Sequence, residues 1–379
     1  MTLPGASPPR EKARREEAER LDVEILTAIG GGWEDPLPEE EFDRLAREIF
    51  AHQFRFIPAY RQLCGLAGVS APADVSSWRE IPAVPAGAFK VGRWATFPPE
   101  AEVAAFQTSG TSQGVSGAHR LDTLGLANAA ILKSARRYVV PDRERIRGLF
   151  LTPPPGAARE SSLVHMFAVY AEAFGEPGSA FILGGRSGVA SARAALDAAV
   201  AAGEPVLVAG AALAYLGVLE STDGSWDLPQ ASRGLVTGGF KGAVRRADPD
   251  GLAASIEERL GITRSHLVQE YGMTELSSQL YDGGLRRGLG FVDESSTGGF
   301  RVPPWMRVRV VEPFSGRDVE PGETGALVHV DLANRGSALV VQTSDMGRAL
   351  EGGVMLAGRE PGAEARGCSL AAELWLERG

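Results

Sequence analysis

A loop rich in glycine and hydroxyl side chains follows a predicted strand and contains groups that can bind phosphate. Its residues are Thr108, Ser109, Gly110, Thr111, Ser112, Gln113 and Gly114. Glycines allow backbone N–H groups to turn toward an anion, and the hydroxyls add further donors. The loop lacks the Gly-Lys-Ser/Thr ending of a Walker loop. The alternative interpretation is a polar turn between two strands, and composition alone leaves both open.

Three further segments downstream combine glycine with aromatic, hydroxyl or charged side chains. They are Thr237-Gly238-Gly239-Phe240-Lys241, Gln269-Glu270-Tyr271-Gly272-Met273-Thr274-Glu275 and Thr343-Ser344-Asp345-Met346-Gly347-Arg348. Each segment alone could be a surface turn.

In this order the four segments resemble the signatures of the adenylate-forming superfamily, which includes acyl-CoA synthetases, luciferases and peptide-synthetase adenylation domains. Residues 106–114 resemble its TSGTTG phosphate loop, and residues 237–241 its glycine-rich adenine-side loop. Residues 269–275 resemble its YGxTE motif, and residues 343–348 the motif whose Asp binds the ribose; four matches in this order argue against coincidence. The resemblance implies that the chain binds ATP and Mg²⁺ and activates a carboxylic acid as an acyl adenylate.

The resemblance also implies roles for individual residues. By this resemblance Tyr271 packs on adenine, Thr274 contacts the α-phosphate, and Glu275 helps to hold Mg²⁺. These roles are chemically reasonable, because a flat ring can cover a base and a carboxylate oxygen suits a hard cation. Asp345 binds both ribose hydroxyls. The residues that complete the nucleotide site are Gly238, Gly239, Phe240, Gly272 and Arg359, and those of the acid pocket are His165, Gly272 and Met273.

Two basic side chains have both a functional and a structural interpretation. Lys241 either approaches a phosphate or the substrate carboxylate, or is a solvated lysine beside a loop. His165 lies near the position where the superfamily places a pocket residue, although a partly buried histidine with satisfied hydrogen bonds is the favoured interpretation. The remaining histidines are scattered without metal-ligand spacing: His52, His119, His266 and His329.

The end of the chain departs from the large synthetases of this superfamily. Those enzymes continue past a GRxDxxIK hinge into a domain that supplies a catalytic lysine. Here Gly358-Arg359 is present, but Pro361 stands at the position of the hinge Asp and Glu364-Ala365 replaces the Ile-Lys pair. Because the sequence ends at Gly379, we expect the lysine-bearing domain to be absent.

The shortened form resembles LuxE-type acyl-protein synthetases over nearly the whole chain. The segment Arg366-Gly367-Cys368-Ser369-Leu370 resembles one whose cysteine carries the acyl group as a thioester. The resemblance implies that Cys368 is an acyl acceptor, and nearby Arg366 favours its thiolate. An acyl-accepting reductase or carrier protein would then collect the group. The alternative is a packed cysteine in a terminal strand. We interpret Cys64, between two leucines, as a packing residue.

Composition limits the classes of partner. The chain has 379 residues, 39 Lys plus Arg and 48 Asp plus Glu, which gives a net charge of −9. This acidic balance argues against nucleic-acid binding and polybasic membrane docking. A run of about 18 apolar residues is lacking, so a membrane span is not expected. The absence of a signal peptide and the two cysteines favour a reduced, cytoplasmic location.

Hydrophobic periodicity predicts alternating strands and helices. We expect an exposed helix at residues 10–28 and a helix at 40–56 that Pro58 ends. Strands at 103–107, 147–152, 180–183, 205–209, 234–237 and 266–270 alternate with helices at 124–139, 161–174, 189–202 and 250–260. After about residue 290, segments 306–311, 325–330 and 338–343 predict a small antiparallel barrel or sheet.

The predicted fold class is therefore α/β: an adenylate-forming N-terminal domain with βαβ subdomains and a small β-barrel-like subdomain, its C-terminal domain largely absent. We divide the chain into a helical N-terminal segment (1–100), an ATP-binding α/β core (101–289), a β-rich subdomain (290–350) and a truncated hinge with a tail (351–379).

Three functions remain open at this point. The first is ATP-dependent activation of a carboxylic acid, fatty acids included, followed by transfer to a protein thiol. The second is activation followed by transfer to a separate carrier protein or to coenzyme A, with Cys368 inert. The third is a nucleotide-binding subunit without catalysis, against which Glu275 and Asp345 argue. The acid itself, alkyl or aryl, is left open.

Overall fold

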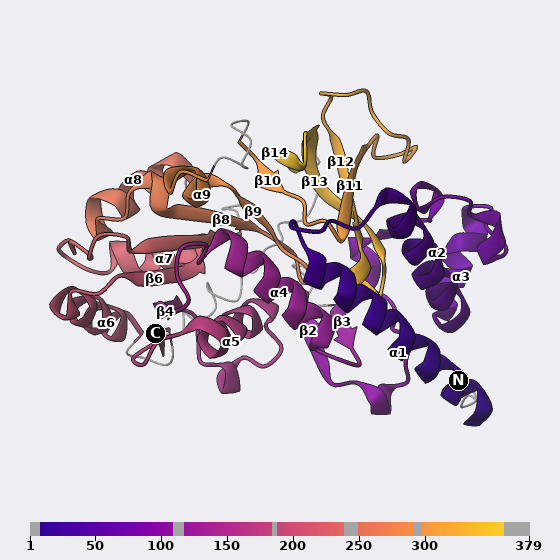
Figure 1. Cartoon of the computed structure of the whole chain (residues 1–379), viewed down its shortest axis with the longest axis horizontal. Coiled ribbons are helices and arrows are strands. Elements are labelled where there is room, and N and C mark those ends of the chain that lie inside the picture. Colours follow the sequence, from indigo (N-terminus) through magenta and orange to yellow (C-terminus); the bar gives the residue numbers. More distant parts are fainter. Residues whose placement is uncertain (1–7, 109–116, 184–187, 239–248, 292–297, 360–379) are drawn as a thin grey trace.

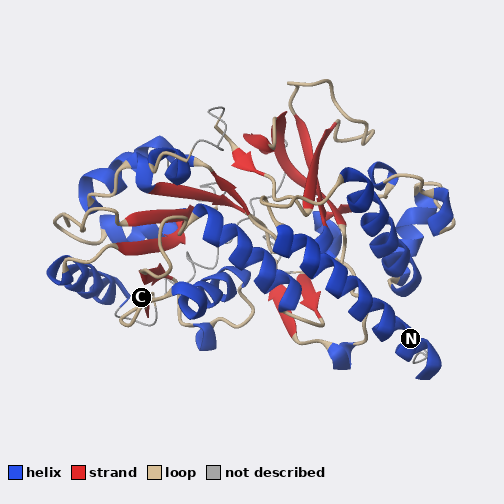
Figure 2. Ribbon diagram, in the orientation of Figure 1, coloured by secondary structure: helices blue, strands red, loops and turns tan. Residues whose placement is uncertain are grey.

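The computed structural model describes residues 8–108, 117–183, 188–238, 249–291 and 298–359. Within these ranges twelve strands form one mixed sheet and two form a separate hairpin (Figures 1 and 2). The order along the large sheet is β11-β12-β13-β14-β10-β9-β8-β7-β6-β4-β5, with β1 beside β13. The predicted mixed α/β architecture is confirmed.

One half of the sheet is parallel and deeply buried. Its strands are β4 (Arg147–Leu151), β5 (Ala180–Phe181), β6 (Val206–Ala211), β7 (Arg233–Thr237) and β8 (Leu267–Tyr271). Every residue of β6 is buried, which explains its unbroken apolar sequence, since a parallel strand is covered on both faces. The strands predicted here are confirmed.

Helices connect and cover these parallel strands. They are α4 (Gly125–Tyr138), α5 (Ser162–Phe174), α6 (Gly188–Ala202), α7 (Ala212–Glu220), α8 (Pro249–Leu260) and α9 (Gly284–Gly288). Figure 1 shows α8 and α9 on one side of the strands and α4 and α5 on the other. Helix α7 was not predicted, because its apolar sequence continues that of β6 without a polar break.

The other half of the sheet is antiparallel. It contains β9 (Leu280–Asp282), β10 (Phe300–Arg301), β11 (Met306–Val311), β12 (Gly325–Asp331), β13 (Val340–Leu350) and β14 (Gly353–Arg359), while β1 (Val84–Pro85) pairs with β13 in parallel. Antiparallel pairing after residue 290 is confirmed. The strand predicted at 338–343 begins later and runs further, and β14 was not predicted. Strands β9 and β10 pair with each other on either side of the boundary predicted at residue 289, so the sheet is continuous there. The division into domains stays a prediction.

Three N-terminal helices cover one end of the molecule. They differ from the predictions in the burial of the first helix and in the role of Pro58. They are α1 (Pro8–Gly31), α2 (Glu39–Phe56) and α3 (Pro58–Leu66). The expectation of an exposed first helix is wrong, because Leu21, Ile25 and Ile29 form a buried stripe at a spacing of four. Pro58 follows the end of α2 and also begins α3, where a first-turn proline loses no helical hydrogen bond.

The core has two parts, one on each half of the sheet. The first gathers α4–α8 around β4–β8, and the second joins α1–α3 to β11–β13. Cys64 is a buried free thiol in the second part, so its predicted packing role is confirmed. Among the helices that the structure describes, none combines the length and the apolar character needed to cross a bilayer.

Candidate nucleotide and acyl-activation site

Two of the predicted nucleotide segments start at the carboxyl ends of neighbouring parallel strands. Strand β7 ends at Thr237 and β8 ends at Tyr271, and Thr237 is paired with Glu270 across the two strands. Gly238 follows β7 with a φ of 71°, a conformation that residues with a Cβ rarely adopt. Ligands of open α/β sheets bind at this edge, so the two segments lie where a nucleotide is expected.

A buried carboxyl group lies beneath these strand ends. Thr237 Oγ1 donates a hydrogen bond to Oε2 of Glu270. Burial raises the pKa of Glu270 to about 7, against the opposing effect of this hydrogen bond. A Cβ at Gly272 would overlap with Oε1 of Glu270. The glycine after Tyr271 therefore provides the room that the carboxyl group occupies.

The third and fourth predicted segments meet in space although they are 74 positions apart. The hydroxyl of Tyr271 donates a hydrogen bond of 3.1 Å to Oδ2 of Asp345, which lies on β13. Burial and the neighbouring Asp345 carboxylate raise the pKa of Tyr271 well above its usual value, so this hydroxyl keeps its proton. Asp345 is thereby held at one position, with lone pairs left for further donors.

Two more side chains complete this cluster. Arg359 on β14 places its Nε 3.0 Å from Oδ1 of Asp345. His329 on β12 is fully buried, and its Nε2 lies 3.3 Å from the Tyr271 hydroxyl oxygen. Burial lowers the pKa of His329 to about 4, so the imidazole is neutral at neutral pH.

The backbone of the Thr274–Glu275 segment is held by side chains from other elements. Oγ1 of Thr274 lies 3.2 Å from Oγ of Ser162, in the first turn of α5. The carbonyl of Thr274 lies 2.8 Å from Nδ1 of His119 on β3 (Ala118–Leu121), and burial lowers the pKa of His119 to about 4. The carbonyl of Glu275 accepts a hydrogen bond of 2.9 Å from Asn334. Both Thr274 and Glu275 are buried.

Two hydrogen bonds join Thr108 and Gly117, the described residues on either side of residues 109–116. Thr108 follows β2 (Ala104–Gln107), and its N–H donates to the carbonyl of Gly117 at 2.9 Å. The Gly117 N–H donates in return to Oγ1 of Thr108 at 3.1 Å. A Cβ at Gly117 would lie 2.6 Å from the backbone of Phe89, so only glycine fits. Thr108 is therefore tied to the fold, whereas residues 109–114 lie outside the described ranges.

His165 has the surroundings of a partly buried histidine with a satisfied hydrogen bond. Its Nε2 lies 2.7 Å from Oδ1 of Asn128, and its ring centroid lies 5.1 Å from that of Phe106. Burial lowers the pKa of His165. Phe106 lies two residues before Thr108, so His165 is close to the start of the predicted phosphate loop. Its role as a pocket residue stays a prediction.

Several predicted site residues lie outside the part of the chain that the structure describes. They are Ser109, Gly110, Thr111, Ser112, Gly114, Gly239, Phe240, Lys241 and Cys368. The described site thus consists of Thr108, the ends of β7 and β8 with the segment up to Glu275, and the Asp345 cluster. Met273 is half-buried within that segment.

The donor set fits Mg²⁺ that arrives with a nucleotide. Among the described residues no group of three or more His, Cys, Asp or Glu side chains is arranged to hold a metal ion by itself. Mg²⁺ in phosphate chemistry usually needs only one or two protein carboxylates, because phosphates and water supply its other ligands. The buried Glu275 has the carboxylate chemistry that such a cation takes, and its role as a Mg²⁺ ligand stays a prediction.

Sequence reasoning missed the side chains that hold the predicted residues in place. His119, Ser162, His329 and Asn334 each contact the Tyr271–Glu275 segment from a distant part of the chain. For Ser162 the sequence offers one clue: Ser161 before it is a typical N-cap residue and indicates that a helix begins there. The others have no local pattern, because their roles depend on tertiary contacts.

Comparisons with known proteins identify the fold. No protein-family model and no curated protein sequence matches this chain. Solved structures of 2-hydroxyisobutyryl-CoA ligase do match. An open conformation in complex with 2-HIB-AMP and CoA has 15% identity and a TM-score of 0.60, and the match covers 89% of this chain and 81% of that one.

Two further states of the same ligase match equally well. The thioesterification state with 2-HIB-AMP and CoA has 16% identity and a TM-score of 0.60, with 86% of this chain and 69% of that one covered. The postadenylation state with R3-HIB-AMP has 16% identity and a TM-score of 0.60, with 90% and 73% covered. At such identities the likeness shows the fold alone. That fold is the α/β fold expected for the N-terminal domain of adenylate-forming enzymes.

Proposed function

We propose that this protein uses ATP to activate a carboxylic acid as an acyl adenylate and then passes the acyl group to a thiol. The observation that carries the proposal is the meeting of Tyr271, Asp345 and Arg359 beside the Thr274–Glu275 segment. A fold shared with a ligase solved with an acyl-AMP supports it.

In the first step an oxygen of the substrate carboxylate attacks the α-phosphorus of ATP, and the bond to pyrophosphate breaks. Tyr271 covers the base, Asp345 accepts the ribose hydroxyl protons, and Thr274 donates toward the α-phosphate. Glu275 holds Mg²⁺, which supplies neutralisation of the phosphate charge. The step depends on positioning and charge, with no covalent contribution from the protein.

In the second step we assign the Cys368 thiolate as the nucleophile, in the manner of LuxE-type acyl-protein synthetases. Its sulfur bonds to the acyl carbon, and the carbon–oxygen bond to AMP breaks. The products are a protein thioester and AMP. A reductase or carrier protein with an acceptor group would remove the acyl chain.

The first experiment measures acid-dependent exchange of labelled pyrophosphate into ATP over a panel of alkyl and aryl acids. We expect exchange with at least one acid class, together with AMP and pyrophosphate release when a thiol acceptor is present. Nucleotide binding without exchange for any acid would refute the proposed activity and leave a binding subunit.

The second experiment assigns the acceptor. After incubation with ATP and the active acid, mass spectrometry should find a hydroxylamine-labile acyl group on the peptide that contains Cys368. Cys368→Ser should keep pyrophosphate exchange but lose this group. Cys64→Ser is the matched control, because Cys64 is buried and burial raises the pKa of its thiol to about 12.

Coenzyme A transfer is the competing outcome of the same experiment. It has one supporting observation, the CoA bound in two of the matching ligase structures. If acyl-CoA forms at equal rates in the wild type and in Cys368→Ser, with no acyl group on the protein, the acceptor is CoA and the self-acylation step is wrong.

A further inference from the structure

A short turn between β12 and β13 lies directly against the Thr274–Glu275 segment. This turn, η8 (Leu332–Asn334), includes a side chain that is fully buried, that of Asn334. Its amide nitrogen donates to the carbonyl of Glu275 at 2.9 Å and to that of Ala338 at 3.0 Å. Both protons of one amide group therefore hold backbone carbonyls, one within the turn and one in the predicted metal-binding segment.

Asp331, the last residue of β12 and the N-cap of this turn, holds the residues that follow Glu275. Oδ2 of Asp331 accepts the N–H groups of Ser277 and Ser278 at 3.0 and 2.9 Å. Its Oδ1 accepts the Ser278 hydroxyl at 2.8 Å and the N–H of Ala333 at 3.0 Å. The backbone from Glu275 to Ser278 is thus held at three points by the side chains of Asp331 and Asn334.

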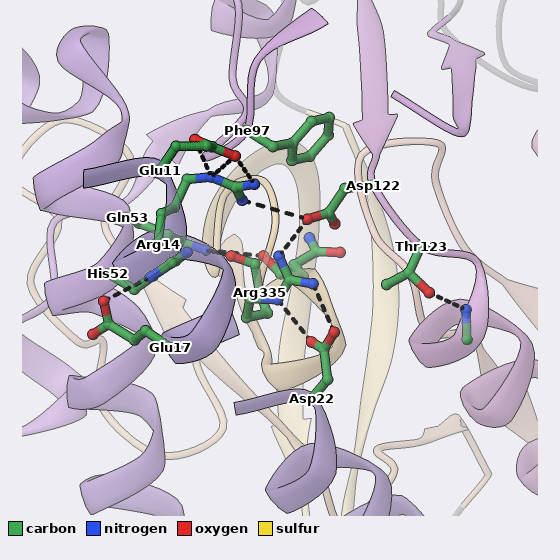
Figure 3. Close-up of polar contacts among 12 residues, drawn as sticks. Glu11, Arg14, Glu17, Asp22, His52, Gln53, Phe97, Asp122, Thr123 and Arg335 are labelled. Atoms are coloured by element: carbon green, nitrogen blue, oxygen red, sulfur yellow. Dashed lines mark hydrogen bonds and ion pairs between the residues drawn. The ribbon is translucent and has the colours of Figure 1, made fainter. Parts of the chain in front are cut away.

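The N-terminal helices hold this turn in place. Gln53 of α2 donates to the carbonyls of Asn334 and Arg335 at 2.9 and 3.1 Å, and it accepts the N–H of Leu339 at 3.0 Å. Figure 3 shows Arg335 between two carboxylates, Asp22 of α1 and Asp122. Arg335 is 1% exposed, and its guanidinium nitrogens lie 2.7 and 2.8 Å from the Asp22 carboxylate and 3.0 Å from that of Asp122. The turn that contacts Glu275 is therefore bound by side chains of two helices, α1 and α2.

We propose that Asn334 is a positioning residue for the reaction: it fixes the backbone of Glu275 so that the carboxylate meets the Mg²⁺ of bound ATP. The inference rests on the proposed function for the role of Glu275. Its physical basis is that a ligand held in advance loses little conformational freedom on binding, and that groups supporting metal ligands typically change affinity or activity about 10–100-fold when removed.

Two variants separate positioning from folding. Asn334→Ala removes the donor to Glu275. Thr222→Val is the matched control, because Thr222 is also buried and its hydroxyl donates 2.8 Å to the carbonyl of Val218 in α7, far along the parallel half. Asn334→Ala removes two buried side-chain hydrogen bonds to backbone carbonyls and Thr222→Val removes one, so the thermal midpoint should fall in both variants and further in Asn334→Ala.

The activity readout is pyrophosphate exchange as a function of Mg²⁺ concentration. We expect the apparent KM for Mg²⁺ to rise by about tenfold in Asn334→Ala, with the maximal rate largely recovered at saturating Mg²⁺. Thr222→Val should keep the wild-type Mg²⁺ dependence. An unchanged KM for Mg²⁺ in Asn334→Ala, or an equal rise in the control, would overturn the proposal while leaving the proposed function standing.

A second readout does not depend on activity. Amide hydrogen exchange of the peptide spanning residues 273–278 should be faster in Asn334→Ala than in the wild type, and unchanged in Thr222→Val. If the wild type shows no pyrophosphate exchange with any acid, the proposed function fails. Unchanged protection of this peptide in Asn334→Ala would show that Asn334 does not hold the segment, whichever reaction the protein catalyses.

Discussion

At the scale of single residues, the candidate site combines groups whose protonation states are set by burial. Tyr271 keeps its proton and donates to Asp345, while His329 beside it is neutral. His119 is neutral as well and contacts the carbonyl of Thr274. These neutral side chains orient Asp345 and the Thr274 backbone without adding positive charge of their own.

Glu275→Ala tests the proposed Mg²⁺ ligand. We expect pyrophosphate exchange to fall by about 100-fold or more, because loss of a direct ligand should cost at least as much as loss of a supporting group. The circular dichroism spectrum should remain that of the wild type. Exchange at the wild-type rate would remove Glu275 from the mechanism.

Asp345→Ala tests the proposed ribose acceptor. Hydrogen bonds to a charged group contribute about 1.5–3 kcal/mol, so the Kd for ATP should rise roughly tenfold or more. Calorimetric titration with ATP measures this directly. Tyr271→Phe keeps the ring and removes only the hydrogen bond to Asp345, so it should weaken binding less. An unchanged Kd in Asp345→Ala would contradict the assignment.

At the scale of elements, the site depends on the long strand β13 and on the turn before it. Asp345 lies midway along β13, opposite Arg359 on β14. The turn η8 precedes β13 and holds the Glu275 backbone through Asn334. The same short region of chain therefore supports both the proposed ribose acceptor and the proposed metal ligand.

The ion pairs of Arg335 should stabilise this region through its contact with α1. Arg335 is buried, and burial raises the pKa of Asp22 despite the neighbouring guanidinium. Removing one partner leaves a buried charge uncompensated, so Arg335→Ala should lower the free energy of unfolding by about 3–5 kcal/mol. Urea unfolding measures the change.

The double variant Arg335→Ala with Asp22→Ala provides the control. It should be less destabilised than the sum of its single variants, because the second change removes one of the unpaired carboxylates. Additive losses would mean that the two side chains do not interact energetically in the folded protein.

At the scale of the whole molecule, one sheet carries both halves of the site. The parallel strands β7 and β8 present the Thr237 and Tyr271 ends, and the antiparallel strands carry Asp345 and Arg359. Since β9 and β10 join the two halves, a change in the buried centre of the sheet affects the stability of the entire fold.

Glu270 at this centre should make global stability depend on pH. Burial raises its pKa from 4.5 to about 7, so the folded protein retains a proton that the unfolded chain loses. The stabilisation from this retained proton is fully present below the pKa of Glu270 in the unfolded chain, and it is lost as pH rises through about 7. Between about pH 5 and 8, the free energy of unfolding should therefore fall more steeply in the wild type than in Glu270→Gln, by up to about 1.4 kcal/mol per pH unit. Parallel profiles from urea unfolding would contradict this.

Local patterns in the sequence determined the strands and helices of the parallel half and the order of the candidate segments. The run that forms β6 is apolar because both faces of the sheet are covered there, and this pattern is visible without a structure. Local patterns could not separate α7 from β6, since the apolar sequence is continuous there. The buried stripe of α1 was hidden by the charges around it.

Only the tertiary structure decided how the candidate residues are supported. The hydrogen bond from Tyr271 to Asp345 and that from Asn334 to the Glu275 carbonyl join positions far apart in the chain. Such pairs have no periodicity and no fixed spacing, because they depend on which strands become neighbours in the sheet. Residue types thus indicated the chemistry, whereas strand pairing determined which side chains hold the reacting groups in place.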